Sequence, residues 1–355
     1  MEKESLEVIN SGENQIHLEY EEPPFHKRAI ANLLDIVFLF LTFIVLFIAV
    51  ENIVHITPGY RKADETVATY REESGLFAYA QQRKTWENIS TWLDNDGTTS
   101  YDYRVQRCQK SISDFIIYIE HKYPTGEQAQ NLKDDYRESR LSDKLKSPDG
   151  KPLFVEIEDE EHPGQMIVVH NPDVSPQVAN SQYYYEHFYR EYTLTNCGSY
   201  MIAIFPEYHS ALTVMSNCFF FIQLPIAAIL SAFFIYFVPG LFFKHGRLTF
   251  GKRLMSVGLV DSRVLSPTVP RFLARWAIFV FGELILSFFT FGIPFIVSTT
   301  MMLVTKRHQG FPDYMLRLVE VDISKQKIYQ DKYEIAFEYT KDHKDAPEFK
   351  MDEEN

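Results

Sequence analysis

Three segments of the chain are nearly free of charged side chains, and each is long enough to cross a bilayer. Beyond Arg28 at its start, residues 28–50 carry only Asp35, residues 213–243 carry no charge, and residues 276–304 carry only Glu283. A helix needs about 20 apolar residues to cross the hydrocarbon core. Soluble core helices rarely stay uncharged over such lengths. The pattern therefore predicts a mainly α-helical integral membrane protein.

The third segment has two interpretations. As one straight span, residues 276–304 would place Lys306 and Arg307 outside the cell, against the preference of basic residues for the cytoplasmic side. Residues 289–294, with the sequence FTFGIP, interrupt the segment near its middle, and glycine and proline both weaken helices. The sequence therefore favours two shorter or re-entrant helices that return the chain to the cytoplasmic side.

The long polar connection between the first two segments, residues 51–212, is predicted to form a mostly helical domain of its own. About 160 residues are enough for a separate core. Hydrophobic spacing predicts helices over residues 60–93 and 114–145. Residues 153–157 and 166–170 are expected to form two short strands across a turn.

Tyrosines and cysteines in this domain are candidates for function. The tyrosine-rich run 181–192 leads towards the second span, and aromatic residues at such a position are typical of the membrane interface. This interpretation is favoured over a ligand site. Cys108 and Cys197 lie in the same domain. They could form a disulfide or remain as two free thiols, and the sequence favours neither state.

The charge of the chain is unevenly distributed. The formal net charge of −13 argues against a nucleic-acid partner, since phosphate binding needs a basic surface. Residues 244–275, however, hold seven basic side chains and one acidic one. Short basic loops stay in the cytoplasm, whereas long domains cross the membrane largely regardless of charge. We therefore expect a multi-pass protein of the cell membrane. Its leader 1–27, the loop 244–275 and the tail 305–355 are cytoplasmic, and residues 51–212 are extracytoplasmic.

Polar side chains form a stripe on the first predicted span. Arg28, Asn32 and Asp35 fall on one helix face at 100° per residue. A bare carboxylate at that depth costs at least ~2.5 kcal/mol, so Asp35 must meet a partner, a proton or water. One interpretation is an ion or proton site at Asp35, and the other is a structural ion pair with Arg28. The sequence favours the ion or proton site.

Glu283 is the second carboxylate inside a predicted span. It lies about two helical turns beyond Arg275, on a similar face. We expect it to join Asp35, Arg28, Arg271 and Arg275 in one polar cluster. Such a cluster suits proton-coupled exchange and equally describes a static salt bridge, and the sequence does not choose between them.

Other chemistry has little support in the sequence. No arrangement of Ser, His and Asp or of Cys and His stands out, so we expect no enzyme activity. The histidines are scattered without the spacing of metal ligands. We expect neither a metal nor another cofactor.

Several motifs resemble the RDD family of bacterial membrane proteins. That family is named for an arginine and an aspartate of its first helix and for a second aspartate. Residues 27–35, KRAIANLLD, resemble the first element and place these residues at Arg28 and Asp35. Residues 249–261 resemble the family's Thr-x-Gly-Lys loop and the strand after it. The other positions that the resemblance assigns are Gly251, Lys252, Arg271, Arg275 and, as the second aspartate, Asp313.

The resemblance covers residues 25–50 and 213–322, and it departs from the family pattern near its end. Pro312 stands where the family usually has histidine, and the Ala-Gly-Thr that normally follows the aspartate is missing. The family implies a small membrane domain suspected in transport, with cation/proton antiport proposed for some members.

Two functions are therefore expected. The first is transport-related exchange of a monovalent cation or proton, with Asp35 as the intramembrane site. The second is a non-transport role in which the outer domain binds a ligand, an envelope component or a protein partner. A second copy of the chain or another membrane protein is open as a partner in the bilayer.

Overall fold

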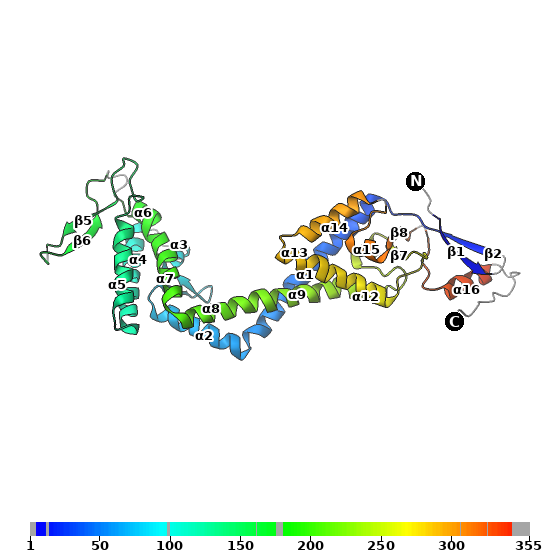
Figure 1. Cartoon of the computed structure of the whole chain (residues 1–355), viewed down its shortest axis with the longest axis horizontal. Helices are drawn as coiled ribbons and strands as arrows, with labels where there is room; N and C mark the ends of the chain where they lie inside the picture. Colours follow the sequence, from blue (N-terminus) through cyan, green and yellow to red (C-terminus); the bar gives the residue numbers. More distant parts are fainter. Residues whose placement is uncertain are drawn as a thin grey trace. The chain divides into compact units, whose positions relative to one another are not determined.

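The computed structural model describes residues 5–11, 14–97, 100–160, 162–174, 180–305, 307–324 and 326–342. These residues are mostly helical, and the chain divides into two compact units (Figure 1). Unit 1 combines Met1–Val54 with Phe219–Asn355, and unit 2 is His55–Cys218.

Three helices of the described chain are long and apolar enough to cross a membrane, namely Phe25–His55, Pro206–Phe242 and Val269–Phe289. The first is α1. The second runs without interruption through α8 (Pro206–Asn217), η3 (Cys218–Gln223), α9 (Leu224–Ala232), η4 (Phe233–Phe237) and α10 (Val238–Phe242). The third consists of α12 (Val269–Ala277), the π-helical segment η5 (Ile278–Ile285) and α13 (Leu286–Phe289). The predicted fold class, a mainly α membrane protein with three hydrophobic segments, is confirmed.

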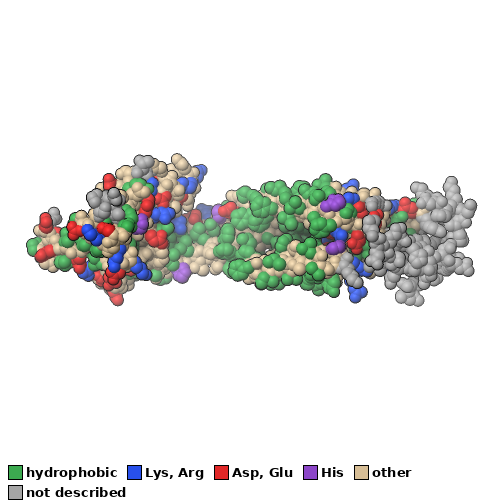
Figure 2. Space-filling model, turned by 90° about the horizontal axis from the view of Figure 1, so that it is seen from above, with side chains coloured by type: hydrophobic (Ala, Val, Ile, Leu, Met, Phe, Trp, Pro, Cys, Tyr) green, Lys and Arg blue, Asp and Glu red, His purple; other side chains and the backbone are tan. Residues whose placement is uncertain are grey.

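The outer surface of these helices is hydrophobic. Figure 2 shows hydrophobic side chains covering the helical part of unit 1 as a continuous band, with charged side chains at the end nearest β7 and β8. Large apolar side chains point outward, for example Phe40 at 62% exposed and Val45 at 67%. Such an area in contact with water would be strongly unfavourable, whereas lipid tails solvate it. The surface therefore fits a bilayer environment.

The third hydrophobic segment is broken, as the sequence favours. The helix ends at Phe289, and a turn with positive φ at Phe291 and Gly292 reverses the chain. Helix α14 (Ile293–Val304) then packs back against η5. Its 12 residues rise only ~18 Å at ~1.5 Å per residue, which is shorter than the ~30 Å hydrocarbon core.

A small polar layer joins three distant parts of unit 1. The strand expected in the basic loop is β7 (Val257–Val260), which pairs antiparallel with β8 (Val319–Asp322) beyond α14. Lys27, in the first turn of α1, forms an ion pair with Asp322 at 2.8 Å, and the backbone N–H of Asp322 donates to the carbonyl of Glu21, before α1, at 3.0 Å. The chain before α1, the loop between the second and third spans, and the chain after α14 therefore lie at the same end of the helices. The remaining elements of unit 1 are β1 (Ser5–Ser11), β2 (Asn14–Glu19), α11 (Phe250–Leu254), α15 (Phe311–Leu316) and α16 (Lys332–Asp342).

Unit 2 is built from helices around a core rich in aromatic residues, with two β-hairpins. The hairpin expected near residue 160 is present as β5 (Phe154–Glu158) and β6 (Met166–His170). The second hairpin is β3 (Phe77–Ala80) with β4 (Thr85–Asn88). Besides α8, the helices of this unit are α2 (Pro58–Glu73), α3 (Ile89–Asn95), α4 (Tyr101–Lys122), α5 (Glu127–Arg140), α6 (Ser181–Tyr184), η1 (Tyr185–Tyr189), η2 (Tyr192–Asn196) and α7 (Cys197–Ile204).

Three expectations for unit 2 are wrong. Residues 60–93 are not one helix, because α2 ends before Gly75, which has a φ of +70°, and the β3–β4 hairpin follows. Residues 114–145 contain the end of α4 and all of α5, separated around Pro124. The tyrosine-rich run is not a membrane-interface belt, since Tyr185 and Tyr189 are each 1% exposed in the core of unit 2.

Cys108 and Cys197 are both buried free thiols in this core. Burial raises the pKa of Cys108 to about 11 and also raises the pKa of Cys197. Because the thiolate is the reactive form, neither should react in the folded protein at pH 8. We expect a maleimide to label at most the half-buried Cys218 in the folded protein, and all three cysteines after unfolding. Mass spectrometry of samples kept without reductant counts the labels. A Cys218→Ser control should then be unlabelled when folded. Only one labelled cysteine after unfolding would instead reveal a disulfide.

Candidate functional site

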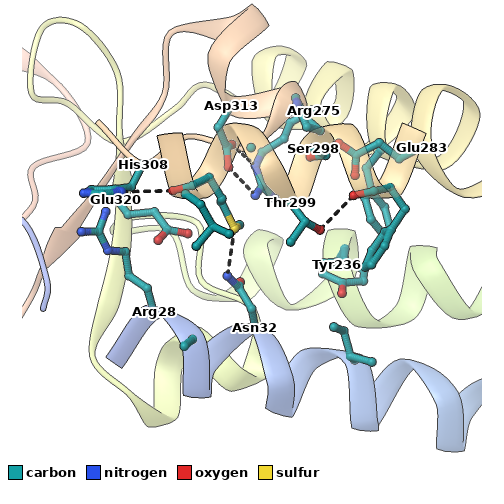
Figure 3. Close-up of a pocket in the computed structure, with 18 of the residues that line it drawn as sticks. Arg28, Asn32, Tyr236, Arg275, Glu283, Ser298, Thr299, His308, Asp313 and Glu320 are labelled. Atoms are coloured by element: carbon teal, nitrogen blue, oxygen red, sulfur yellow. Dashed lines mark hydrogen bonds and ion pairs between the residues drawn. The ribbon is translucent and has the colours of Figure 1, made fainter. Parts of the chain in front are cut away.

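A cavity of about 360 Å³ lies within unit 1, between α1, α14 and the helix formed by α12 and η5 (Figure 3). The loop around α15 and the strand β8 also contribute to its wall. Apolar and aromatic side chains make up about half of the lining. The polar and charged residues of the wall are Arg28, Asn32, Tyr236, Arg275, Glu283, Ser298, Thr299, His308, Asp313 and Glu320.

Unpaired polar atoms are concentrated in this cavity. Within the described chain, five buried side-chain nitrogen or oxygen atoms have no hydrogen-bond partner. Four of them belong to the cavity residues Arg28 (Nε and Nη1), Trp276 (Nε1) and Glu283 (Oε1), and the fifth is Nε of Arg107 in unit 2. Buried polar groups are nearly always paired, and an unpaired one costs roughly 1–3 kcal/mol. Their presence in one cavity marks it as the candidate binding site.

Arg28 and Asn32 reach the cavity from α1. Arg28 is 8% exposed, and its Nη2 lies 3.6 Å from a carboxylate oxygen of Glu22, while its other two nitrogens are unpaired. The Nδ2 of Asn32 is 3.8 Å from the sulfur of Met302 on α14. A spacing of three or four residues puts a series of α1 side chains on one helix face. The side chains of α1 that line the cavity are Phe25, Arg28, Ala29, Asn32 and Ile36.

Glu283 reaches the cavity from η5. It is 4% exposed and lies beside Ser298 of α14 (Figure 3). The oxygen of Ser298 accepts a hydrogen bond of 3.0 Å from the backbone N–H of Phe311, so the return of the chain after α14 helps to position this wall. Aromatic rings surround this part of the cavity, including Tyr236, Trp276 and Phe279.

Arg275 and Asp313 form a buried ion pair in the cavity wall. Two nitrogens of Arg275 donate to the two carboxylate oxygens of Asp313, with Nη2 and Oδ2 3.0 Å apart. Asp313 is 4% exposed. Burial alone would raise its pKa, but the charge and hydrogen bonds of Arg275 outweigh burial and hold the pKa below its ordinary value. Asp313 is therefore a carboxylate that is already neutralised by its partner.

Asp35 does not line this cavity, although the sequence favours it as the ion or proton site. It is 1% exposed, and both of its oxygens accept hydrogen bonds from the basic loop. The hydroxyl of Thr249 donates to Oδ2, and the backbone N–H of Gly251 donates to Oδ1 at 2.8 Å. Asp35 therefore attaches α11 to α1. The alternative of an ion pair with Arg28 is wrong, because Arg28 contacts Glu22.

The remaining motif positions hold the polar layer together. Lys252 is 2% exposed and pairs with Glu320 of β8 at 2.7 Å. Arg271 contacts Asp261 at 3.3 Å and donates to the carbonyl of Leu316 at 2.6 Å. The single polar cluster expected from the sequence is thus divided into separate pairs.

The structure brings Arg28, Asn32 and Glu283 to one cavity, and sequence reasoning missed the residues that complete it. Trp276 looks like an ordinary membrane aromatic in the sequence. Ser298 and Thr299 are hydroxyl side chains in the middle of an apolar run, which is a weak signal of a polar surface. Neither observation shows that α14 would turn back against η5.

These features fit a multi-pass membrane protein with a cavity among helices that are long and apolar enough to cross a bilayer. The RDD family model matches residues 197–317, which confirms the resemblance to that family over this part of the chain. The matched range contains Gly251, Lys252, Arg271 and Asp313, and it does not include Arg28 or Asp35. Neither a curated protein nor a solved structure gives a significant match to the chain.

Proposed function

We propose that the protein is a transport-related membrane protein whose cavity holds the transported species, with Glu283 as the carboxylate that binds a cation or proton. The observation that carries this proposal is the unpaired Oε1 of Glu283, which is buried in a spanning helix and lines the cavity. Ionisable residues at such positions typically mark ion or substrate pathways. Asp35 fits this role less well, because the protein already satisfies both of its oxygens.

The broken helix pair supports a transport role. Helix α14 is too short to cross the bilayer, and its Ser298 and Thr299 line the cavity. Interrupted helices at membrane depth are tolerated where they are packed in protein or line a wet cavity, and they are common at transporter binding sites. In this proposal the protein lies in the cell membrane with the basic loop 244–275 in the cytoplasm and residues 51–212 outside.

Replacing Glu283 by glutamine tests the proposal. In proteoliposomes that contain the full chain and a pH-sensitive dye, a sodium or potassium gradient should drive proton movement. We expect Glu283→Gln to reduce this flux at least tenfold, since an amide of the same size cannot carry the charge. The exposed Glu72 of unit 2 offers a matched control, and Glu72→Gln should leave the flux unchanged.

The outcomes separate the two expected functions. If Glu283→Gln and the wild-type protein show equal proton flux, Glu283 is excluded as the site. If the wild-type protein shows no proton flux with either cation, the transport proposal is overturned. It would leave the second interpretation, in which unit 2, with its own core, binds a ligand or partner.

A further inference from the structure

The cavity holds two residues of opposite charge, Arg28 and Glu283, and each has buried polar atoms without a hydrogen-bond partner. Figure 3 shows Arg28 and Glu283 on opposite sides of the site, with Asn32 and Thr299 between them. Along the third helix the lining extends from Phe272 to Glu283, which corresponds to ~16 Å at ~1.5 Å per residue. Among the described ion pairs, none joins Arg28 to Glu283, so the two charges do not satisfy each other.

The surroundings of Glu283 fit an organic ammonium group better than a bare metal cation. Tyr236, Trp276 and Phe279 line the same cavity as Glu283, and aromatic rings can bind ammonium groups through their faces. Metal cations instead need several oxygen ligands at short distances. A volume of about 360 Å³ lies in the range of small-molecule pockets, roughly 300–1,000 Å³.

The surroundings of Arg28 fit an anionic group. Two of its nitrogens are unpaired although the residue is more than nine-tenths buried, and a guanidinium binds carboxylate and phosphate groups through such donors. Glu22 contacts only Nη2, and at 3.6 Å. An anion at this end would supply the acceptors that the protein does not.

We infer that the cavity binds an organic zwitterion, with its anionic group at Arg28, its ammonium group at Glu283, and an apolar linker along the aromatic wall. The inference rests on the proposed use of this cavity and names the class of molecule that it takes. Arg28 and Glu283 lie on opposite sides of the site (Figure 3), and this arrangement favours a linear molecule with charges at its two ends. Zwitterionic lipid headgroups carry their charges only a few bonds apart, so they fit this arrangement less well.

A series of linear ω-amino carboxylates tests the inference on the full chain in detergent. Each compound is compared with an alkylamine and an alkyl carboxylate of the same length, by competition binding or thermal shift. We expect one chain length at which the zwitterion binds at least tenfold more tightly than both singly charged analogues. Shorter and longer zwitterions should lose this advantage.

Two substitutions assign the ends of the molecule. Arg28→Gln should make the zwitterion bind no more tightly than the alkylamine, because the carboxylate loses its partner. Glu283→Gln should make it bind no more tightly than the alkyl carboxylate, because the ammonium group loses its partner. Arg28→Lys should restore much of the binding, and Glu72→Gln should change nothing. Size-exclusion profiles that match the unchanged chain establish that the variants are folded.

The result distinguishes this inference from the proposed function. Equal binding of zwitterion and alkylamine at every length would overturn the inference, as would no binding of any compound by a chain with Glu283-dependent flux. In both cases the proposed cation or proton exchange would stand. Zwitterion-selective binding without any flux would overturn the transport proposal and support the inference alone.

Discussion

Replacing Gly251 by alanine should destabilise unit 1 by about 3–5 kcal/mol, because the added methyl group would collide with the backbone of α1. A Cβ at this position would lie 2.2 Å from the carbonyl oxygen of Ala31 and 2.9 Å from Oδ1 of Asp35. Overpacking alone typically costs 1–3 kcal/mol. Moving α1 away would also break the buried hydrogen bond from Gly251 to Asp35, at roughly 1–3 kcal/mol. The measurement is the thermal unfolding midpoint in detergent.

Gly282 offers a matched control within a spanning helix. A Cβ at Gly282 would meet its nearest atoms, on Ile278 and Phe311, at the ordinary contact distance of 3.8 Å. Gly282→Ala should therefore change the midpoint little. If both alanine variants unfold at the same temperature, the close approach of the loop to α1 is not what stabilises this unit.

The membrane architecture could be predicted because it follows from local sequence. The length of each apolar run identifies the spanning helices, and the glycine and proline near residue 292 predict the break before α14. Arg28 and Glu283 could be singled out for the same reason, since isolated charges at membrane depth need a function or a partner. These inferences need no knowledge of which helices are neighbours.

The partners of these residues could not be predicted, because they depend on contacts between distant parts of the chain. Asp35 accepts hydrogen bonds from a loop more than 200 residues away, and its charge alone predicts an ion pair as readily as a backbone contact. Trp276 and Ser298 meet at the cavity only once α14 has folded back. In unit 2, the helical spacing of residues 60–93 is overridden at Gly75, where the backbone needs a positive φ.

Asp313→Asn should cost about 3–5 kcal/mol, because it leaves the charge of Arg275 without its carboxylate in a buried place. The double variant Arg275→Met with Asp313→Leu removes both charges and should recover most of the loss, since apolar residues often replace buried ion pairs without penalty. Thermal midpoints of the two single variants and the double variant measure the coupling. Additive losses would show that the two residues do not act as a pair.

The same ion pair predicts how stability depends on pH. Because Arg275 holds the pKa of Asp313 below the value of about 3.9 expected for an unfolded chain, the pair stabilises the fold above that pH, and the contribution is lost as the pH falls through the folded pKa. The Asp313→Asn variant should therefore lose less stability on acidification than the wild-type protein does.

The exposed pair of Lys327 and Glu338, also in unit 1, provides the control. Glu338→Gln should cost less than about 1 kcal/mol at pH 7. A midpoint for Asp313→Asn equal to that of Glu338→Gln at pH 7 would contradict a stabilising buried pair.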